Sequence, residues 1–115
     1  MSAERMRRVD EAVRQVISDA LAHDVKDPRV GFVTVTDVKT SPDLRHARVY
    51  VSVLGDPAAR EASMEGLRSA HGFLQGRVAG ELHLKNTPGL VFVYDDTAER
   101  AQRIEQLIDS SVETS

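Results

Sequence analysis

Apolar residues in the first quarter of the chain recur at the spacing of an amphipathic helix. Between residues 4 and 22 an apolar side chain returns every three or four positions, which places these side chains on one helical face. They are Met6, Val9, Val13, Val16, Ile17, Ala20 and Leu21. Asp27-Pro28 then signals a turn, because proline disfavours helical geometry in the residue that precedes it. The pattern predicts a helix that ends near residues 23–27.

The period of the apolar positions changes to two in the next part of the chain. Residues 32–38 are rich in β-branched side chains and predict a first strand, which the turn signal Ser41-Pro42-Asp43 follows. From residue 46 to residue 53 the odd positions are apolar and the even positions are polar. This alternation predicts a second strand with one buried face, paired antiparallel with the first.

A helical spacing returns after Asp56-Pro57, where an N-cap residue precedes a proline at the first helical position. The apolar positions of this segment are Met64, Leu67, Ala70, Leu74, Val78 and Leu82. Gly72 interrupts the segment, and glycine costs about 1 kcal/mol relative to alanine inside a helix. We therefore expect two helices that meet at a break at Ala70-His71-Gly72. At this break Gly72 would supply a positive φ or a close approach that a side chain would block.

The last quarter of the chain contains one short strand and one more helix. Residues 90–94 are almost wholly apolar, as in a strand that is buried on both faces. Asp96 and Glu99 match the capping box of a helix. The apolar positions of that helix are Ala101, Ile104, Leu107 and Ile108. Residues 110–115 are expected to form a flexible acidic tail, so that one domain spans residues 1–109.

The predicted order is helix, strand, strand, helix, broken helix, strand, followed by an acidic helix. Two strands joined through a pair of helices are expected to run parallel with a right-handed crossover, which makes the second strand the centre of a three-stranded mixed sheet. The helices should pack on one face of that sheet. This α+β arrangement (αββααβ) is that of a type II KH-like domain, an RNA-binding fold. The rival ferredoxin-like plait needs a strand where this chain opens with a helix.

Composition indicates where such a domain works. The chain has 115 residues, enough for one domain with its own core, and contains no cysteine, as is typical of a reduced cytosol. Its start lacks the apolar segment of a secretory signal, and no apolar stretch reaches membrane-spanning length. We therefore expect a soluble, cytoplasmic monomer without a membrane contact.

The net charge of −3 argues against a nucleic-acid partner only until its distribution is considered. Residues 1–89 carry thirteen Lys or Arg and twelve Asp or Glu, whereas residues 90–115 carry two basic and six acidic residues. RNA binding would therefore depend on a local basic face rather than on a general positive field. The candidate RNA contacts are Arg5, Arg7, Arg8, Lys26, Arg29, Arg45, Arg48, Arg68, Arg77 and Lys85, together with Ala70, His71 and Gly72 at the helix break.

Glycines and aromatic residues add two further possibilities for RNA contact. Gly72, Gly76 and Gly80 fall on one helical face opposite the apolar stripe, so they either admit close approach by RNA or merely face solvent. Tyr50 and Phe32 are candidates for stacking on bases, although packing in the core is the expected role of Phe32.

No motif in the chain predicts an enzyme. The phosphate loop, the serine nucleophile elbow and the His-Glu-x-x-His zinc pair are all missing from the sequence. His23, His46, His71 and His83 lie too far apart to predict a local metal site. Asp95-Asp96 is more simply explained by capping of the last helix than by metal binding. We expect no catalysed reaction and no cofactor.

Several segments resemble the ribosome-binding factor A family in their order and spacing. These segments are Lys26-Asp27-Pro28-Arg29, Val33-Thr34-Val35-Thr36-Asp37-Val38, Ser41-Pro42-Asp43-Leu44, Ser69-Ala70-His71-Gly72-Phe73-Leu74, Thr87-Pro88 and Val93-Tyr94-Asp95-Asp96. No single segment is decisive, but together they span roughly residues 5–108 in one register.

The resemblance implies a KH-like protein in which an Ala-x-Gly kink, here Ala70-His71-Gly72, replaces the Gly-x-x-Gly loop of ordinary KH domains. It implies a factor, associated with growth in the cold, that binds free 30S small ribosomal subunits and assists late maturation and 16S rRNA processing. A maturation GTPase would help its release. Residues 75–86 are less basic than the resemblance implies, which shifts the expected contacts towards Arg5, Arg7, Arg8, Arg45 and Arg48. A KH-like protein-interaction module without direct RNA binding is the alternative.

Overall fold

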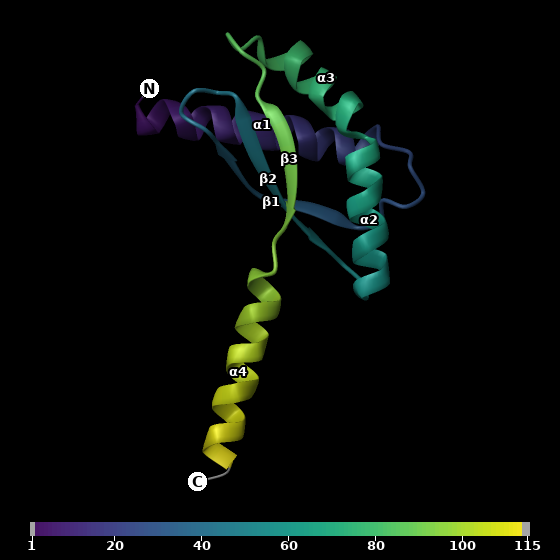
Figure 1. Ribbon diagram of the computed structural model, residues 1–115, viewed down its shortest axis with the longest axis vertical. Coiled ribbons are helices and arrows are strands. Elements are labelled where there is room, and N and C mark those ends of the chain that lie inside the picture. The colour runs from purple at the N-terminus through teal and green to yellow at the C-terminus, as the bar shows by residue number, and fades with distance from the viewer. Residues whose placement is uncertain (1, 114–115) are drawn as a thin grey trace.

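The computed structural model describes residues 2–113, and the side chains of residues 2–108. Its elements follow the predicted order, and the last helix points away from the rest of the molecule (Figure 1). They are α1 (Ala3–His23), β1 (Val33–Thr40), β2 (His46–Val53), α2 (Pro57–Ser69), α3 (His71–Leu82), β3 (Gly89–Tyr94) and α4 (Thr97–Glu113). The element order and the mixed sheet confirm the α+β, type II KH-like fold class.

The sheet has the strand order β1-β2-β3, so β2 is its central strand. β1 and β2 pair antiparallel because a short turn joins them, whereas β2 and β3 pair parallel because two helices return the chain to the same end. In Figure 1 the sheet lies in front of α1, and α3 and α2 run along its right-hand side. The helices thus cover one face of the sheet, as expected.

The core lies between the sheet and the first three helices. The odd positions of β2 are all buried, and its even positions are exposed or half-buried. Ile17, Leu67 and Leu74 are the largest fully buried side chains and come from α1, α2 and α3. Burial of one such side chain stabilises the fold by roughly 1.5–3 kcal/mol. The apolar stripes in the sequence therefore predicted these helices correctly.

A β-bulge at Thr36 interrupts the alternation along β1. The register shifts between Val35 and Asp37, which leaves Thr36 without a residue opposite it on β2. As a result Val35 and Val38 are both buried, although they lie three positions apart in the sequence, because their partners Val51 and Val49 lie two positions apart on β2. Pairing continues to Thr40, two residues beyond the predicted end of this strand.

Two expectations about burial were wrong. Phe32 precedes β1 instead of belonging to it, and its side chain is 78% exposed, so it does not pack in the core. β3 is an edge strand whose Leu90 and Phe92 are buried, while Val91 is 49% exposed. An apolar run in a sequence does not reveal whether a second layer covers both faces of the strand.

The break between α2 and α3 falls at Ala70, where the sequence predicted it. Asp56 caps α2 by accepting a hydrogen bond from the N–H of Ala59 at 2.8 Å. Ala70 has φ −83° and ψ 3°, which ends α2, and α3 begins at the next residue. At the far end of α3, His83 adopts the left-handed conformation with φ 47°.

The start of α4 is not held by the predicted capping pair. Asp95, not Asp96, accepts the N–H of Thr97 at 3.0 Å, and its other oxygen accepts the hydroxyl of Thr36 at 2.7 Å. These hydrogen bonds, the one from Thr36 foremost, lower the pKa of Asp95 to about 2. Asp96 instead accepts a hydrogen bond from Nε of Arg100 at 2.9 Å.

A second set of contacts ties the base of α4 to the body. Glu99 accepts the hydroxyl of Tyr94, and Arg60 of α2 lies 3.3 Å from the same carboxylate. The Arg60 guanidinium also stands 4.6 Å from the centre of the Tyr94 ring, a cation–π contact. The hydrogen bond to Glu99 raises the pKa of Tyr94.

Beyond this base, α4 extends away from the body and contributes to a longest dimension of 59 Å (Figure 1). The helix continues to Glu113 and so includes the first four residues of the predicted flexible tail, and residues 114 and 115 lie outside the described part. Polar residues such as serine are tolerated in an exposed helix at a cost below about 1 kcal/mol each, so their presence does not end it.

Candidate nucleic-acid interface

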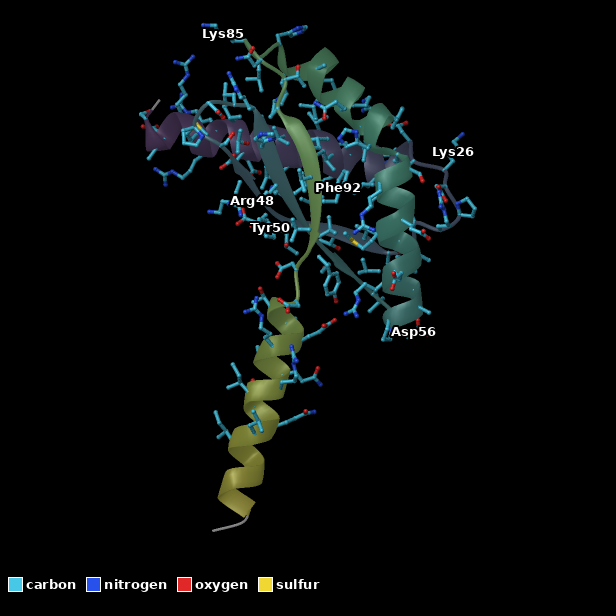
Figure 2. The ribbon with its side chains drawn as sticks, in the orientation of Figure 1. Lys26, Arg48, Tyr50, Asp56, Lys85 and Phe92 are labelled. Atoms are coloured by element: carbon cyan, nitrogen blue, oxygen red, sulfur yellow. The ribbon has the colours of Figure 1, made fainter. Side chains whose placement is uncertain are left out.

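The candidate basic residues divide between two ends of the sheet. At one end the N–H of Gly89 donates to the carbonyl of Arg45 at 2.8 Å, which places the loop before β3 beside the β1–β2 turn. At the other end Lys26 and Ala70 line one shallow hollow, so the loop after α1 lies against the α2–α3 junction. Figure 2 accordingly shows Lys85 and Lys26 on different sides of the molecule.

We name the two groups by these positions. The hairpin-end group consists of Arg5, Arg7, Arg8, Arg45, Arg48 and Lys85. The elbow group consists of Lys26, Arg29, Arg68, Ala70, His71 and Gly72. The predicted contacts therefore do not form one continuous patch.

The β1–β2 turn presents Arg45 on a backbone fixed by short polar side chains. The hydroxyl of Ser41 donates to Asp43 at 2.6 Å, and Asp43 accepts the N–H of Arg45 at 3.1 Å. These two hydrogen bonds lower the pKa of Asp43, the one from Ser41 more strongly. Leu44 has φ 59° and is buried, which anchors the turn from below. The exposed Arg45 side chain thus projects from a rigid turn.

The first half of α1 is held against the same end of the sheet. The N–H of Thr40, the last residue of β1, donates to Asp10 at 2.9 Å. Arg7 lies about one helical turn before Asp10, and Arg7 and Lys39 line a common hollow between α1 and β1. Helix α1 therefore contributes its basic residues to the hairpin end.

At the elbow, Arg29 is engaged in holding the fold. Its guanidinium donates to both oxygens of Asp27, at 3.0 and 2.6 Å, and to the hydroxyl of Ser69 at 2.9 Å. The hydrogen bond from the Arg29 side chain is the main reason why the pKa of Asp27 falls to about 2. The hydroxyl of Ser63, which is buried in α2, accepts a hydrogen bond from the N–H of Gly31 at 3.2 Å. Together these bonds pin the loop after α1 onto α2.

The expectation of special backbone geometry at Gly72 was wrong. Gly72 lies inside α3 without a positive φ, and a Cβ atom built there would meet nothing within 4 Å. Gly76 and Gly80 are equally open, which confirms that the three glycines face away from the core. His71 lies within hydrogen-bonding distance of the Leu90 carbonyl, 3.0 Å from Nε2, and so contacts the edge of β3.

Ion pairing separates the candidates further. Arg77 pairs with Asp24 of the loop after α1 and, at 3.2 Å, with Glu81, so its charge joins α3 to that loop. The other candidates with a carboxylate partner are Arg8, Arg29 and Arg45. Among the described residues, the candidates without an ion pair are Arg5, Arg7, Lys26, Arg48, Arg68 and Lys85.

Two residues of interest escaped the sequence prediction. Lys39 lies beside Arg48 in the register of β1 and β2, but it follows the residue at which the first strand was expected to end. The second strand is eight residues long, and this length indicated that the first strand, which pairs with it, extends beyond residue 38. Gln75 donates to the carbonyl of Pro88 at 2.6 Å and accepts the N–H of Leu90 at 3.0 Å, which satisfies backbone groups at the edge of β3.

Other binding chemistries find little support in the described residues. No group of three or more His, Asp or Glu side chains within the described part is placed to hold a metal ion. None of the described helices is both long enough and apolar enough to cross a membrane.

Comparisons with known proteins agree with this fold and these segments. The family model described as ribosome-binding factor A matches residues 5–108. The chain is 44% identical over 108 residues to a ribosome-binding factor A of Halothermothrix orenii, which covers 94% of this chain and 88% of that protein. It is 51% identical over 105 residues to one of Anaeromyxobacter sp. strain K, which covers 90% and 76%.

Solved structures give the same result. A solution structure of a Thermotoga maritima protein, provisionally assigned as a ribosome-binding factor A, has a TM-score of 0.72 and 35% identity over 81% of this chain and 89% of that one. A homology model of the Thermus thermophilus factor, fitted into an electron microscopy map of a 30S complex, has a TM-score of 0.56 and 25% identity over 73% and 92%. This chain therefore belongs to the ribosome-binding factor A family.

Proposed function

We propose that this protein binds the free 30S ribosomal subunit and assists late maturation and 16S rRNA processing. The observation that carries the proposal is family membership across residues 5–108, together with the Thermus thermophilus factor that was fitted into a map of a 30S complex. In this proposal the protein acts in the cytoplasm as a monomer, catalyses no reaction of its own, and is released with the help of a maturation GTPase.

The hairpin-end group is the proposed rRNA contact. Arg5, Arg7, Arg48 and Lys85 have no carboxylate partner among the described residues, so their charges are available to phosphates. Arg45 stands on a rigid turn, which limits the entropy lost when its side chain binds. Of the basic residues at the elbow, Lys26 and Arg68 have no ion pair within the described part of the chain, and we propose that they make secondary contacts.

Sedimentation tests the proposal directly. The purified protein is centrifuged with isolated 30S subunits, with isolated 50S subunits and with assembled ribosomes, each at several salt concentrations. We expect it to travel with free 30S subunits and to dissociate as salt rises, because phosphate contacts release counterions. Co-sedimentation chiefly with assembled ribosomes, or binding indifferent to salt, would contradict the proposal.

A matched pair of double variants locates the contact. Arg7→Ala/Arg48→Ala removes two unpaired charges at the hairpin end, and Lys26→Ala/Arg68→Ala removes two at the elbow. The first variant should reduce the slope of log affinity against log salt by about 2, roughly 1 for each phosphate contact. The elbow variant should change the slope less. A larger effect from the elbow variant would move the contact to that end.

A protein-interaction module without RNA binding is the second candidate function, and α4 is the observation that favours it. Ile104, Leu107 and Ile108 are 57%, 68% and 57% exposed on this projecting helix. Exposed apolar side chains on one helix are typical of a docking surface. Under this alternative, the protein would bind a protein partner equally well in the absence of rRNA.

A further inference from the structure

The face of the sheet that the helices leave uncovered has an unusual composition. The even positions of β2 project from it, and Figure 2 shows Arg48 and Tyr50 next to each other on this strand. Beside them on β3, Val91 is 49% exposed and Val93 is half-buried. A solvated sheet face normally carries polar side chains, so an exposed and a half-buried valine next to a tyrosine need another explanation.

The strand register arranges these residues in two rows across the sheet. One row contains Lys39, Arg48 and Val91, and the next contains Asp37, Tyr50 and Val93. The first row therefore offers two basic groups next to an apolar one. The second offers an aromatic ring with an apolar side chain next to it. We call these six residues the open sheet face.

The second row lies in a hollow at the base of α4. This hollow has a volume of about 310 Å³. Tyr50 and Val93 line it together with two basic residues, Lys39 and Arg100, and three acidic residues, Asp37, Asp95 and Asp96. The hydrogen bonds of Asp95 to Thr36 and Thr97 fix the wall that α4 provides. Its volume is at the small end of the pockets that hold single small ligands, roughly 300–1,000 Å³.

The ring of Tyr50 and the charge of Arg48 favour a nucleotide as the occupant. Arg48 is exposed and has no ion pair among the described residues, whereas Lys39 lies 3.8 Å from the Asp37 carboxylate and Arg100 pairs with Asp96 at 2.9 Å. An uncharged base stacks on an aromatic ring whatever its sequence, and the phosphates favour the unpaired Arg48 outside the hollow. A protein partner would need a more continuous apolar surface than two valines and one tyrosine supply.

We propose that the open sheet face binds an unpaired nucleotide of single-stranded RNA, with the base stacked on Tyr50 next to Val93 and the phosphates near Arg48. This inference rests on the proposed rRNA binding. It adds a second RNA contact next to the hairpin-end group, and Arg48 belongs to both. The site lies on the face of the sheet opposite the helices and their Ala70-His71-Gly72 break.

Binding of a fluorescently labelled hexa-uridylate to the full chain tests the inference, with 30S co-sedimentation and the thermal midpoint measured on every variant. Tyr50→Leu keeps an apolar side chain but removes the ring, and we expect it to weaken hexanucleotide binding about tenfold. Tyr50→Phe keeps the ring, so binding should stay within about twofold of the original. Phe32→Leu is the matched control, because it removes a ring that is more exposed but lies outside the open sheet face.

Each outcome decides the question. Unchanged hexanucleotide binding in Tyr50→Leu, a larger loss in Phe32→Leu, or no binding by the original protein overturns the inference. If Tyr50→Leu does not fold, cross-linking of a 4-thiouridine hexanucleotide to the original protein decides instead: a cross-linked peptide that contains Tyr50 supports the site, and cross-links only elsewhere refute it. If the original protein does not bind 30S subunits but binds the hexanucleotide in a way that depends on Tyr50, the proposed function is refuted and this site is supported.

Discussion

The hairpin end and the elbow carry similar basic residues but use them differently. At the elbow the Arg29 guanidinium is occupied by Asp27 and Ser69, within hydrogen-bonding distance of both. At the hairpin end Arg48 stands on an open sheet face without a carboxylate partner among the described residues. The difference shows that a count of basic residues does not locate an RNA-binding surface, because some of the charges already stabilise the fold.

Packing reinforces the contrast. At the elbow Val30 lies directly over Gly66 of α2, so close that a Cβ atom at Gly66 would stand 2.6 Å from a Val30 methyl carbon. At the hairpin end the turn is held mainly by hydrogen bonds among Ser41, Asp43 and the backbone. Changes at the elbow should therefore affect stability first, and changes at the hairpin end should affect binding first.

The largest expected effect on stability comes from filling the space at Gly66. Gly66→Val forces the loop away from α2, and overpacking of this kind typically costs about 1–3 kcal/mol of unfolding free energy. Urea denaturation measures the loss. The fraction of the Gly66→Val protein that is folded should still co-sediment with 30S subunits. A Gly66→Val protein as stable as the original would show that the loop is not packed on α2 as described.

Exchange of one arginine at each end sharpens the comparison. Arg29→Ala removes the partner of Asp27 and Ser69, so we expect a lower thermal midpoint with little change in 30S affinity. Arg48→Ala should leave the midpoint unchanged and weaken 30S binding, most clearly at low salt. Thermal denaturation and salt-dependent sedimentation measure the two effects. The reverse pattern would break the proposed division of labour.

Much of the fold followed from the sequence because its signals are local. The stripe of α1, the alternation of β2 and the Asp56-Pro57 cap each predicted their element correctly. The order of the elements then determined the parallel pairing of β3 with β2. Local periodicity was sufficient wherever one face of an element meets the core.

The errors arose where the outcome depends on distant residues. The bulge at Thr36 changes the register of β1, and Thr36 in turn contacts Asp95, which follows 59 residues later. Exposure of Val91 depends on the absence of a covering layer, which no local pattern reports. The tethering of Arg29 and Arg77 likewise needs carboxylates brought close by folding or by a turn. The candidate site could therefore be listed by residue type but not divided into two ends.

Acid titration tests the elbow by a different route. Arg29 holds the pKa of Asp27 at about 2, below its ordinary value of 3.8. A carboxylate with a lowered pKa in the folded state adds stability above its unfolded pKa, and this stability is lost as pH falls through about 2. Asp27→Asn should therefore lower the thermal midpoint at pH 6, and the difference from the original should shrink towards about pH 2.

Arg29→Ala serves as the companion to this titration. It removes the cause of the shift but keeps the Asp27 carboxyl, so it should flatten the acid dependence in the same way. If the difference in thermal midpoint between Asp27→Asn and the original stays constant from about pH 6 to pH 2, the charge of Asp27 does not contribute to the stability of the elbow.

The smallest expected effect concerns Gly72, a second helical glycine of the elbow region that differs sharply from Gly66. A Cβ atom at Gly72 meets nothing within 4 Å, and the residue has no positive φ. Gly72→Ala should therefore raise the unfolding free energy, by up to about 1 kcal/mol, because alanine is the better helix former. Urea denaturation gives the sign, and a destabilised variant would contradict the open position of this residue.

Gly72→Asp extends the test from stability to binding. Gly72 is the second residue of α3, where a negative charge interacts favourably with the helix dipole, so stability should be maintained. If the main rRNA contact lies at the hairpin end, the added charge is not part of the contact surface and is screened by salt, so 30S affinity should hardly change. If the RNA instead passes over the elbow, the carboxylate repels it and affinity falls while stability does not. Because Gly72→Ala adds volume without charge at the same position, the difference between the two variants isolates the electrostatic part and decides between the two ends.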